Sequence, residues 1–148
     1  MAGRGGAMRI EELPAGREMD ALIAEHIFKW RKMRGPKTDY DGPCESFDVL
    51  IPPDIEDPFP LYSFRGSIKP WYFCSKWSTQ LAAAWEVVET LGELGYTCVI
   101  EWKGSDRFYA GTAEVNIVKN LYTVGLGVGT FPEALSRAAL MAMGVTEL

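Results

Sequence analysis

Two segments of the chain combine aromatic rings with cations, the chemistry that stacks a nucleobase and neutralises a phosphate. Their members are Arg65, Lys69, Trp71 and Lys76 in the first segment and Lys103, Arg107 and Tyr109 in the second. Aromatic residues in strands more often belong to a core, so either segment alone is more typical of structure than of a site. If the fold brings the two segments together, they predict a pocket for a nucleotide-derived ligand.

Other polar residues do not predict catalysis. His26 is the only histidine, and no serine or cysteine motif accompanies it, so a structural role is expected. Asp54, Glu56 and Asp57 stand between prolines without the ligand spacing of a calcium loop, and they indicate a solvated loop. A phosphodiesterase would need paired histidines or a metal cluster, which the sequence does not offer. We therefore expect no enzyme, no metal and no cofactor.

A glycine-rich stretch, Val124–Thr130, joins a predicted strand to a predicted helix. Such backbone at a helix N-terminus could hold phosphate, but the spacing fits neither the dinucleotide nor the P-loop pattern, and Pro132 removes an amide donor. Alternating glycines also let a strand accept close packing, for example from a bulky aromatic side chain. The second interpretation is favoured here.

The composition limits the class of protein. The chain has 148 residues and a net charge of −5, which fits one globular domain and argues against broad binding to nucleic acid or an anionic membrane. Cys44, Cys74 and Cys98 are odd in number and widely spaced, which predicts reduced thiols in a cytoplasm. No apolar run reaches signal-peptide or membrane-spanning length.

Helical periodicity appears in three places. Apolar residues recur at three- and four-residue steps from Arg17 to about Lys32, and again from about Thr79 to Leu94, where Gly95 is a suitable C-cap. A third helix is predicted over Phe131–Met143, and Thr130 followed by Glu133 has the spacing of a capping box. These helices must position any site.

The remaining segments predict strands and loops. Four β-rich runs are expected to form strands: Trp71–Ser75, Tyr96–Trp102, Phe108–Val118 and Leu121–Val128. The sequence therefore predicts an α+β fold, with an antiparallel sheet of about four strands sandwiched with three helices. Residues 1–9 are expected to form a disordered tail, with the start codon at Met1 or Met8, and residues 10–148 a single domain with a long Pro-rich loop over 34–70.

Three helical blocks carry a resemblance. Met19–Glu25, then Ser78-Thr79 ahead of Ala82-Ala83-Ala84-Trp85-Glu86-Val87-Val88-Glu89, then Ala134–Leu140 resemble the phage ABA-sandwich domain family, small phage proteins that mostly lack an assigned activity. The likeness covers most of the chain from Ile10 onward and implies a phage origin and a layered fold. Loop 34–70 departs from the shorter family pattern, and no site residue is carried over.

The expected function is binding without turnover. By analogy with phage proteins of similar size that sequester immune messengers, the sequence predicts a non-enzymatic protein of the host bacterial cytoplasm that holds a cyclic ADP-ribose isomer or a cyclic oligonucleotide, countering anti-phage defence. Its site would comprise the two aromatic and cationic segments, and a homodimer or higher homo-oligomer would deepen the pocket. The alternative is a structural or protein-binding phage accessory that acts through its aromatic surface and its long loop.

Overall fold

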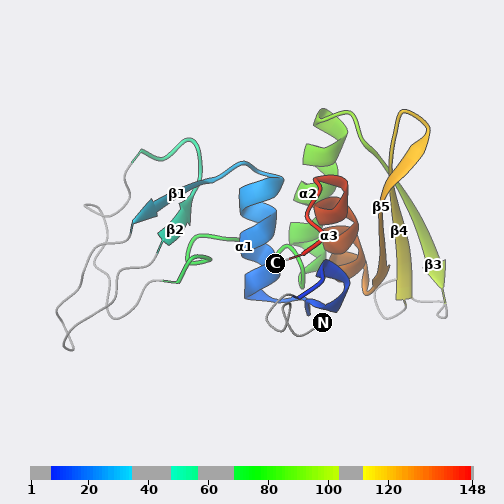
Figure 1. Ribbon diagram of the computed structural model, residues 1–148, viewed down its shortest axis with the longest axis horizontal. Coiled ribbons are helices and arrows are strands. Elements are labelled where there is room, and N and C mark those ends of the chain that lie inside the picture. Colours follow the sequence, from blue (N-terminus) through cyan, green and yellow to red (C-terminus); the bar gives the residue numbers. More distant parts are fainter. Residues whose placement is uncertain (1–7, 35–47, 57–68, 104–111, 148) are drawn as a thin grey trace.

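The computed structural model describes residues 8–34, 48–56, 69–103 and 112–147. Within these ranges the fold is α+β, with three α-helices and two antiparallel sheets of two and three strands. Figure 1 shows its layers in order: the two-stranded sheet, helix α1, the pair of helices α2 and α3, and the three-stranded sheet. The α+β class is as predicted, but the strands do not form a single sheet.

The three-stranded sheet consists of β3 (Thr97–Lys103), β4 (Thr112–Lys119) and β5 (Tyr122–Gly129), in that order. Asn120 and Leu121 connect β4 to β5 with φ angles of 53° and 70°, the left-handed conformation that a two-residue hairpin turn requires. A register shift between Ile117 and Val118 marks a β-bulge in the same hairpin. The three strands follow the period-two pattern of the sequence.

One face of this sheet is covered by helices. Helix α3 (Phe131–Ala142) packs directly on it, and α2 (Leu81–Glu93) packs against α3. The inward side chains of β4 alternate with outward ones, because Ala113, Val115 and Ile117 are all fully buried. The predicted apolar face of α3 lies in this core, and Gly95 follows α2 with the left-handed φ of 90° that its C-cap role predicts.

Helix α1 (Arg17–His26) is shorter than its periodicity predicts. The chain reverses at Lys29, whose φ is 59°, and continues into β1 (Arg31–Arg34), which pairs with β2 (Asp48–Ile51). Trp30, expected on the helix, instead packs edge-on against Trp77 with ring centroids 5.5 Å apart. The predicted extension to Lys32 is wrong because a tertiary contact with the segment before α2 replaced the next helical turn.

Residues 71–75, predicted as a strand, form turns. The Tyr72 N–H donates to Lys69 O and the Cys74 N–H to Trp71 O, which closes two successive turns. Arg17 Nη2 then donates to both Trp71 O and Cys74 O, each at 2.8 Å. Because turns and the guanidinium use these backbone groups, the segment is not a strand of the sheet.

The two ends of the described chain meet. The 3-10 helix η2 (Ile10–Glu12) begins where Ile10 N–H donates to Thr146 O at 2.9 Å, and Arg9 forms a β-bridge with Glu147. Ile10 and Leu13 are buried in the core beside α3. In the described part of the chain, none of the helices has the length and apolar character needed to cross a membrane.

Candidate functional site

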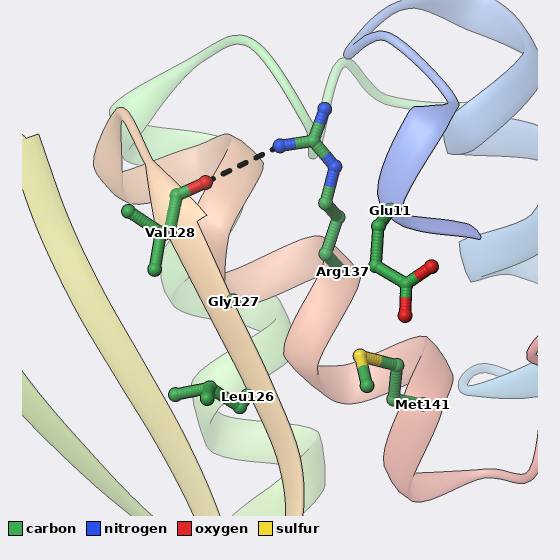
Figure 2. Close-up of a pocket in the computed structure, with 6 residues that line it drawn as sticks. All are labelled: Glu11, Leu126, Gly127, Val128, Arg137 and Met141. Carbon is green, nitrogen blue, oxygen red and sulfur yellow. Dashed lines mark hydrogen bonds between the residues drawn. The ribbon is translucent and has the colours of Figure 1, made fainter. Parts of the chain in front are cut away.

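A groove runs along the edge of β5 that faces away from β4. Its volume is about 370 Å³. It lies between β5, α3 and η2 and is lined by Glu11, Leu126, Gly127, Val128, Arg137 and Met141. Figure 2 shows β4 on one side of β5 and the side chains of Glu11, Arg137 and Met141 on the other. The volume lies within the range of small-molecule and peptide-side-chain pockets.

The backbone of β5 turns polar groups toward this groove. Arg137 Nη1 donates to Val128 O at 3.3 Å from the side opposite β4, so this carbonyl points away from the sheet (Figure 2). In an antiparallel ladder the N–H and C=O of one residue point to the same side, and residues two apart are alike. The N–H and C=O of Leu126 therefore also face the groove, and β5 pairs with β4 alone among the described strands.

Helix α3 packs closely against β5 beside the groove. A Cβ atom placed on Gly127 would lie 1.9 Å from Ala134 O, and one on Gly125 would lie 1.9 Å from Ala138 O. The glycines thus admit the helix backbone itself, where the sequence suggested an aromatic side chain. Helix carbonyls fill the space that a phosphate would need beside these two glycines.

Arg137 is the cation of the groove. Its Nη1 lies 2.7 Å from Glu133 Oε1, and its Nη2 donates to Leu13 O at 2.8 Å. Its Nε is buried and has no acceptor among the described residues. Glu133 is therefore engaged with Arg137, and Thr130 makes no side-chain cap bond, so the predicted capping box is wrong. The guanidinium retains capacity for a further acceptor.

Apolar side chains border the groove on the uncovered face of the sheet. Leu126 is 43% exposed and Val128 51% exposed, and Val99 on β3 is 49% exposed on the same face. Glu101 on β3 and Glu114 on β4 lie opposite each other in the same row as Val128. The described residues provide no layer over this face. A bound chain at the β5 edge would therefore meet apolar side chains on one side and Arg137 on the other.

The two aromatic and cationic segments predicted from the sequence are not brought together in the described part of the chain. Lys69, Trp71 and Lys76 lie in the turns before α2, beside α1, whereas Lys103 ends β3 at the far edge of the molecule (Figure 1). Arg65, Arg107 and Tyr109 lie outside the described residues, as does the side chain of Lys103. The described residues give no common pocket.

The first of these segments is anchored to the core. Trp71 is half-buried against the main core, and Tyr72, which is 54% exposed, packs edge-on against Phe73. Lys69 and Lys76, which precede and follow Tyr72 in the sequence, are exposed. Tyr72 is therefore a better stacking surface in this segment than Trp71, the residue expected from the sequence.

A buried polar network holds this segment in place. Asp20 and Ser78 are both fully buried, and Asp20 Oδ1 accepts hydrogen bonds from the Ser78 N–H and hydroxyl, each at 2.8 Å. Arg17 Nη1 lies 3.1 Å from Asp20 Oδ2. Since each group of the network has a partner within the chain, the network positions α1 against the turns and leaves no reactive group.

The remaining candidate groups do not form a reactive centre. His26 is half-buried, with Nε2 4.0 Å from Glu25 Oε2. Among the described residues no three of His, Cys, Asp and Glu gather as metal ligands; Asp57, the last of the acidic cluster, lies outside them. Burial raises the pKa of the Cys74 thiol to about 12, and burial also raises the pKa of Cys98. Both thiols are therefore protonated at neutral pH.

Comparison with known proteins identified no relative of this chain. The chain matches no protein family, no curated protein and no solved structure. The resemblance to phage ABA-sandwich proteins thus stays a prediction from the three helical blocks.

Proposed function

We propose that this domain is a protein-binding module that takes an extended segment of a partner as an additional strand beside β5. One observation carries the proposal: the backbone N–H and C=O groups of Leu126, together with those of Val128, face an open groove. Strand addition to such an edge supplies main-chain hydrogen bonds, and the groove side chains supply specificity. The proposed binding involves no catalytic step.

The groove predicts the kind of segment that binds. Side chains of an added strand alternate between the α3 side and the uncovered face. On the α3 side they meet Arg137 and Met141, which favours an acidic residue and an unbranched apolar residue. On the other side they extend the apolar surface of Leu126 and Val128.

Peptide selection tests the proposal. Peptides would be selected by display on the wild-type domain and counter-selected on Leu126→Pro. From the direction of Val128 O we infer that the Leu126 N–H points away from β4, so proline removes a donor of the groove and leaves the β4 ladder intact. Selected peptides should lose at least about tenfold in affinity on Leu126→Pro and on N-methylation of alternate peptide residues. Strand addition would be contradicted if the selected peptides bind Leu126→Pro as tightly as the wild type and tolerate N-methylation. It would also be contradicted if the selection gives no peptide whose affinity depends on the β5 edge.

Sequestration of a nucleotide-derived messenger, with the role in countering phage defence that the sequence predicts, is a second candidate. The exposed Tyr72, with exposed Lys69 three residues before it and exposed Lys76 four residues after it, favours it, because this segment offers a stacking surface and two cations. A thermal-shift screen with cyclic dinucleotides, cyclic trinucleotides and cyclic ADP-ribose isomers tests it. The ligand should raise the melting temperature, be recovered intact, and lose its effect on Tyr72→Ala. No shift with any of these ligands would remove this candidate.

A further inference from the structure

We infer that the strand which β5 accepts is β5 of a second copy of this chain, so that two three-stranded sheets join into one continuous sheet. The inference rests on the proposed function and names its partner. It starts from the composition of the edge. Tyr122–Gly129 contains no charged residue and no proline over its whole length. Edge strands of monomeric proteins are usually protected by lysine, proline or a covering segment, and β5 has neither residue.

Antiparallel pairing of two β5 strands gives hydrogen-bond partners to the outward backbone groups of both copies. A two-fold axis at Gly127 places Leu126 of each copy opposite Val128 of the other. The backbone groups of both residues face outward, so each such pair exchanges both of its N–H···O bonds. The existing contact from Arg137 Nη1 to Val128 O is long, at 3.3 Å, and is readily exchanged for a strand bond.

The charges of the groove do not oppose a copy running in the opposite direction. Figure 2 shows the Arg137 guanidinium at the Val128 end of the groove and the Glu11 carboxylate about level with Gly127. The two-fold axis carries Glu11 of each copy toward Arg137 of the other. Within one copy, Arg137 Nη1 donates to Glu133 Oε1 and Nη2 donates to Leu13 O, while its Nε is buried. Glu11 is ion-paired with Arg9 at 3.3 Å and Arg137 with Glu133 at 2.7 Å, so the joint strand pair brings no uncompensated charges of like sign together.

The remaining surface favours this edge over other contacts between copies. The chain carries a net charge of −5, and face-to-face stacking of two uncovered sheet faces would bring Glu101 and Glu114 of both copies together. Pairing at the β5 edge avoids these carboxylates. It also joins the exposed Leu126 and Val128 side chains of the two copies into one apolar strip.

Sedimentation equilibrium of the purified full chain over a wide concentration range tests the inference. Three variants are compared with the wild type: Leu126→Pro, Leu126→Lys and the matched control Val99→Lys. Leu126 and Val99 share the uncovered face with similar exposure, but Val99 lies on β3, one strand beyond β4. Circular dichroism of each variant reports whether the fold is retained, and both Lys variants change exposed side chains only.

The wild type should dimerise, and Leu126→Lys should raise the dimer dissociation constant at least about tenfold, because two added charges meet near the axis. Leu126→Pro should be monomeric and Val99→Lys should dimerise like the wild type. Hydrogen exchange of the Leu126 and Val128 amides should slow with protein concentration in the wild type. A monomeric wild type, or a dimer lost in Val99→Lys and kept in Leu126→Lys, overturns the inference. Either result leaves the peptide selection as a separate test of strand addition from another protein, and that selection can fail independently.

Discussion

Replacing Gly127 with alanine should separate α3 from the sheet. The added Cβ would lie 1.9 Å from the carbonyl oxygen of Ala134, whereas ordinary contacts begin at 3.4 Å. The obstacle is helix backbone, which cannot rotate away as a side chain does. Helix α3 must therefore retreat by about 1.5 Å, or β5 must bend outward by a similar amount.

The cost follows from what lies along this contact. Ala134, Leu135 and Ala138 are fully buried between α3 and its neighbours, and a gap of this size removes much of their dispersion energy. Overpacking alone costs about 1–3 kcal/mol. With the loosened helix interface added, we expect the free energy of unfolding to fall by about 3–5 kcal/mol. This is a large fraction of the about 5–15 kcal/mol that a domain possesses.

Urea denaturation followed by far-ultraviolet circular dichroism measures this loss. Gly92→Ala is the matched control, because Gly92 lies in α2 with nothing within 4 Å of its Cβ position. Helix propensity predicts a gain of about 0.5–1 kcal/mol for the control. The reasoning is refuted if Gly127→Ala loses less than about 1 kcal/mol, since α3 would then not pack on β5 by its backbone.

Three further predictions concern the anchored turns and the thiol. In urea titrations, Asp20→Ala should lower the free energy of unfolding by about 3 kcal/mol, because it leaves the buried Ser78 N–H without an acceptor. The control Lys32→Ala removes an exposed ion pair and should change the free energy of unfolding by less than about 0.5 kcal/mol. Above pH 9 the unfolded chain releases the Cys74 proton while the folded chain holds it up to about pH 12. Stability should therefore fall with rising pH in this window, by up to about 1.4 kcal/mol per unit, and Cys74→Ala should remove that component of the slope. Cys74 should react with a thiol reagent only on unfolding, which stopped-flow absorbance would show by equal labelling and unfolding rates.

Elements with local signals could be predicted from the sequence. Strand β4 alternates polar and apolar positions, β5 alternates glycine with apolar residues, and α3 has a continuous apolar face. The turn between the two strands was predicted one residue early, at Lys119-Asn120, whereas Asn120 and Leu121 form it.

The other wrong predictions depend on contacts distant in sequence. Trp30 lies outside helix α1 and packs on Trp77. In the segment 71–75, the carbonyl groups of Trp71 and Cys74 accept hydrogen bonds from Arg17. Periodicity carries no information about such partners.

The candidate site escaped the sequence analysis for a related reason. Arg137 lies on a helix and Glu11 in a 3-10 turn more than a hundred residues earlier, and only the tertiary fold brings them to one strand edge. A signal was nevertheless present. Tyr122–Gly129 is a strand pattern without charge or proline, which is unusual for a strand at the edge of a sheet. Its edge position, however, follows only from the sheet order.

The arrangement of β3, β4, β5 and α3 also affects how the chain folds. These elements are consecutive between Thr97 and Ala142, and each packs on the one before it. Their contacts close short stretches of chain, so little loop entropy opposes them. By contrast, Ile10 reaches Thr146 and Arg137 reaches Leu13 across almost the whole sequence. We expect the three strands and α3 to form the folding nucleus, with η2 and α1 docking later, so that the β5 edge is built before the segment that borders it.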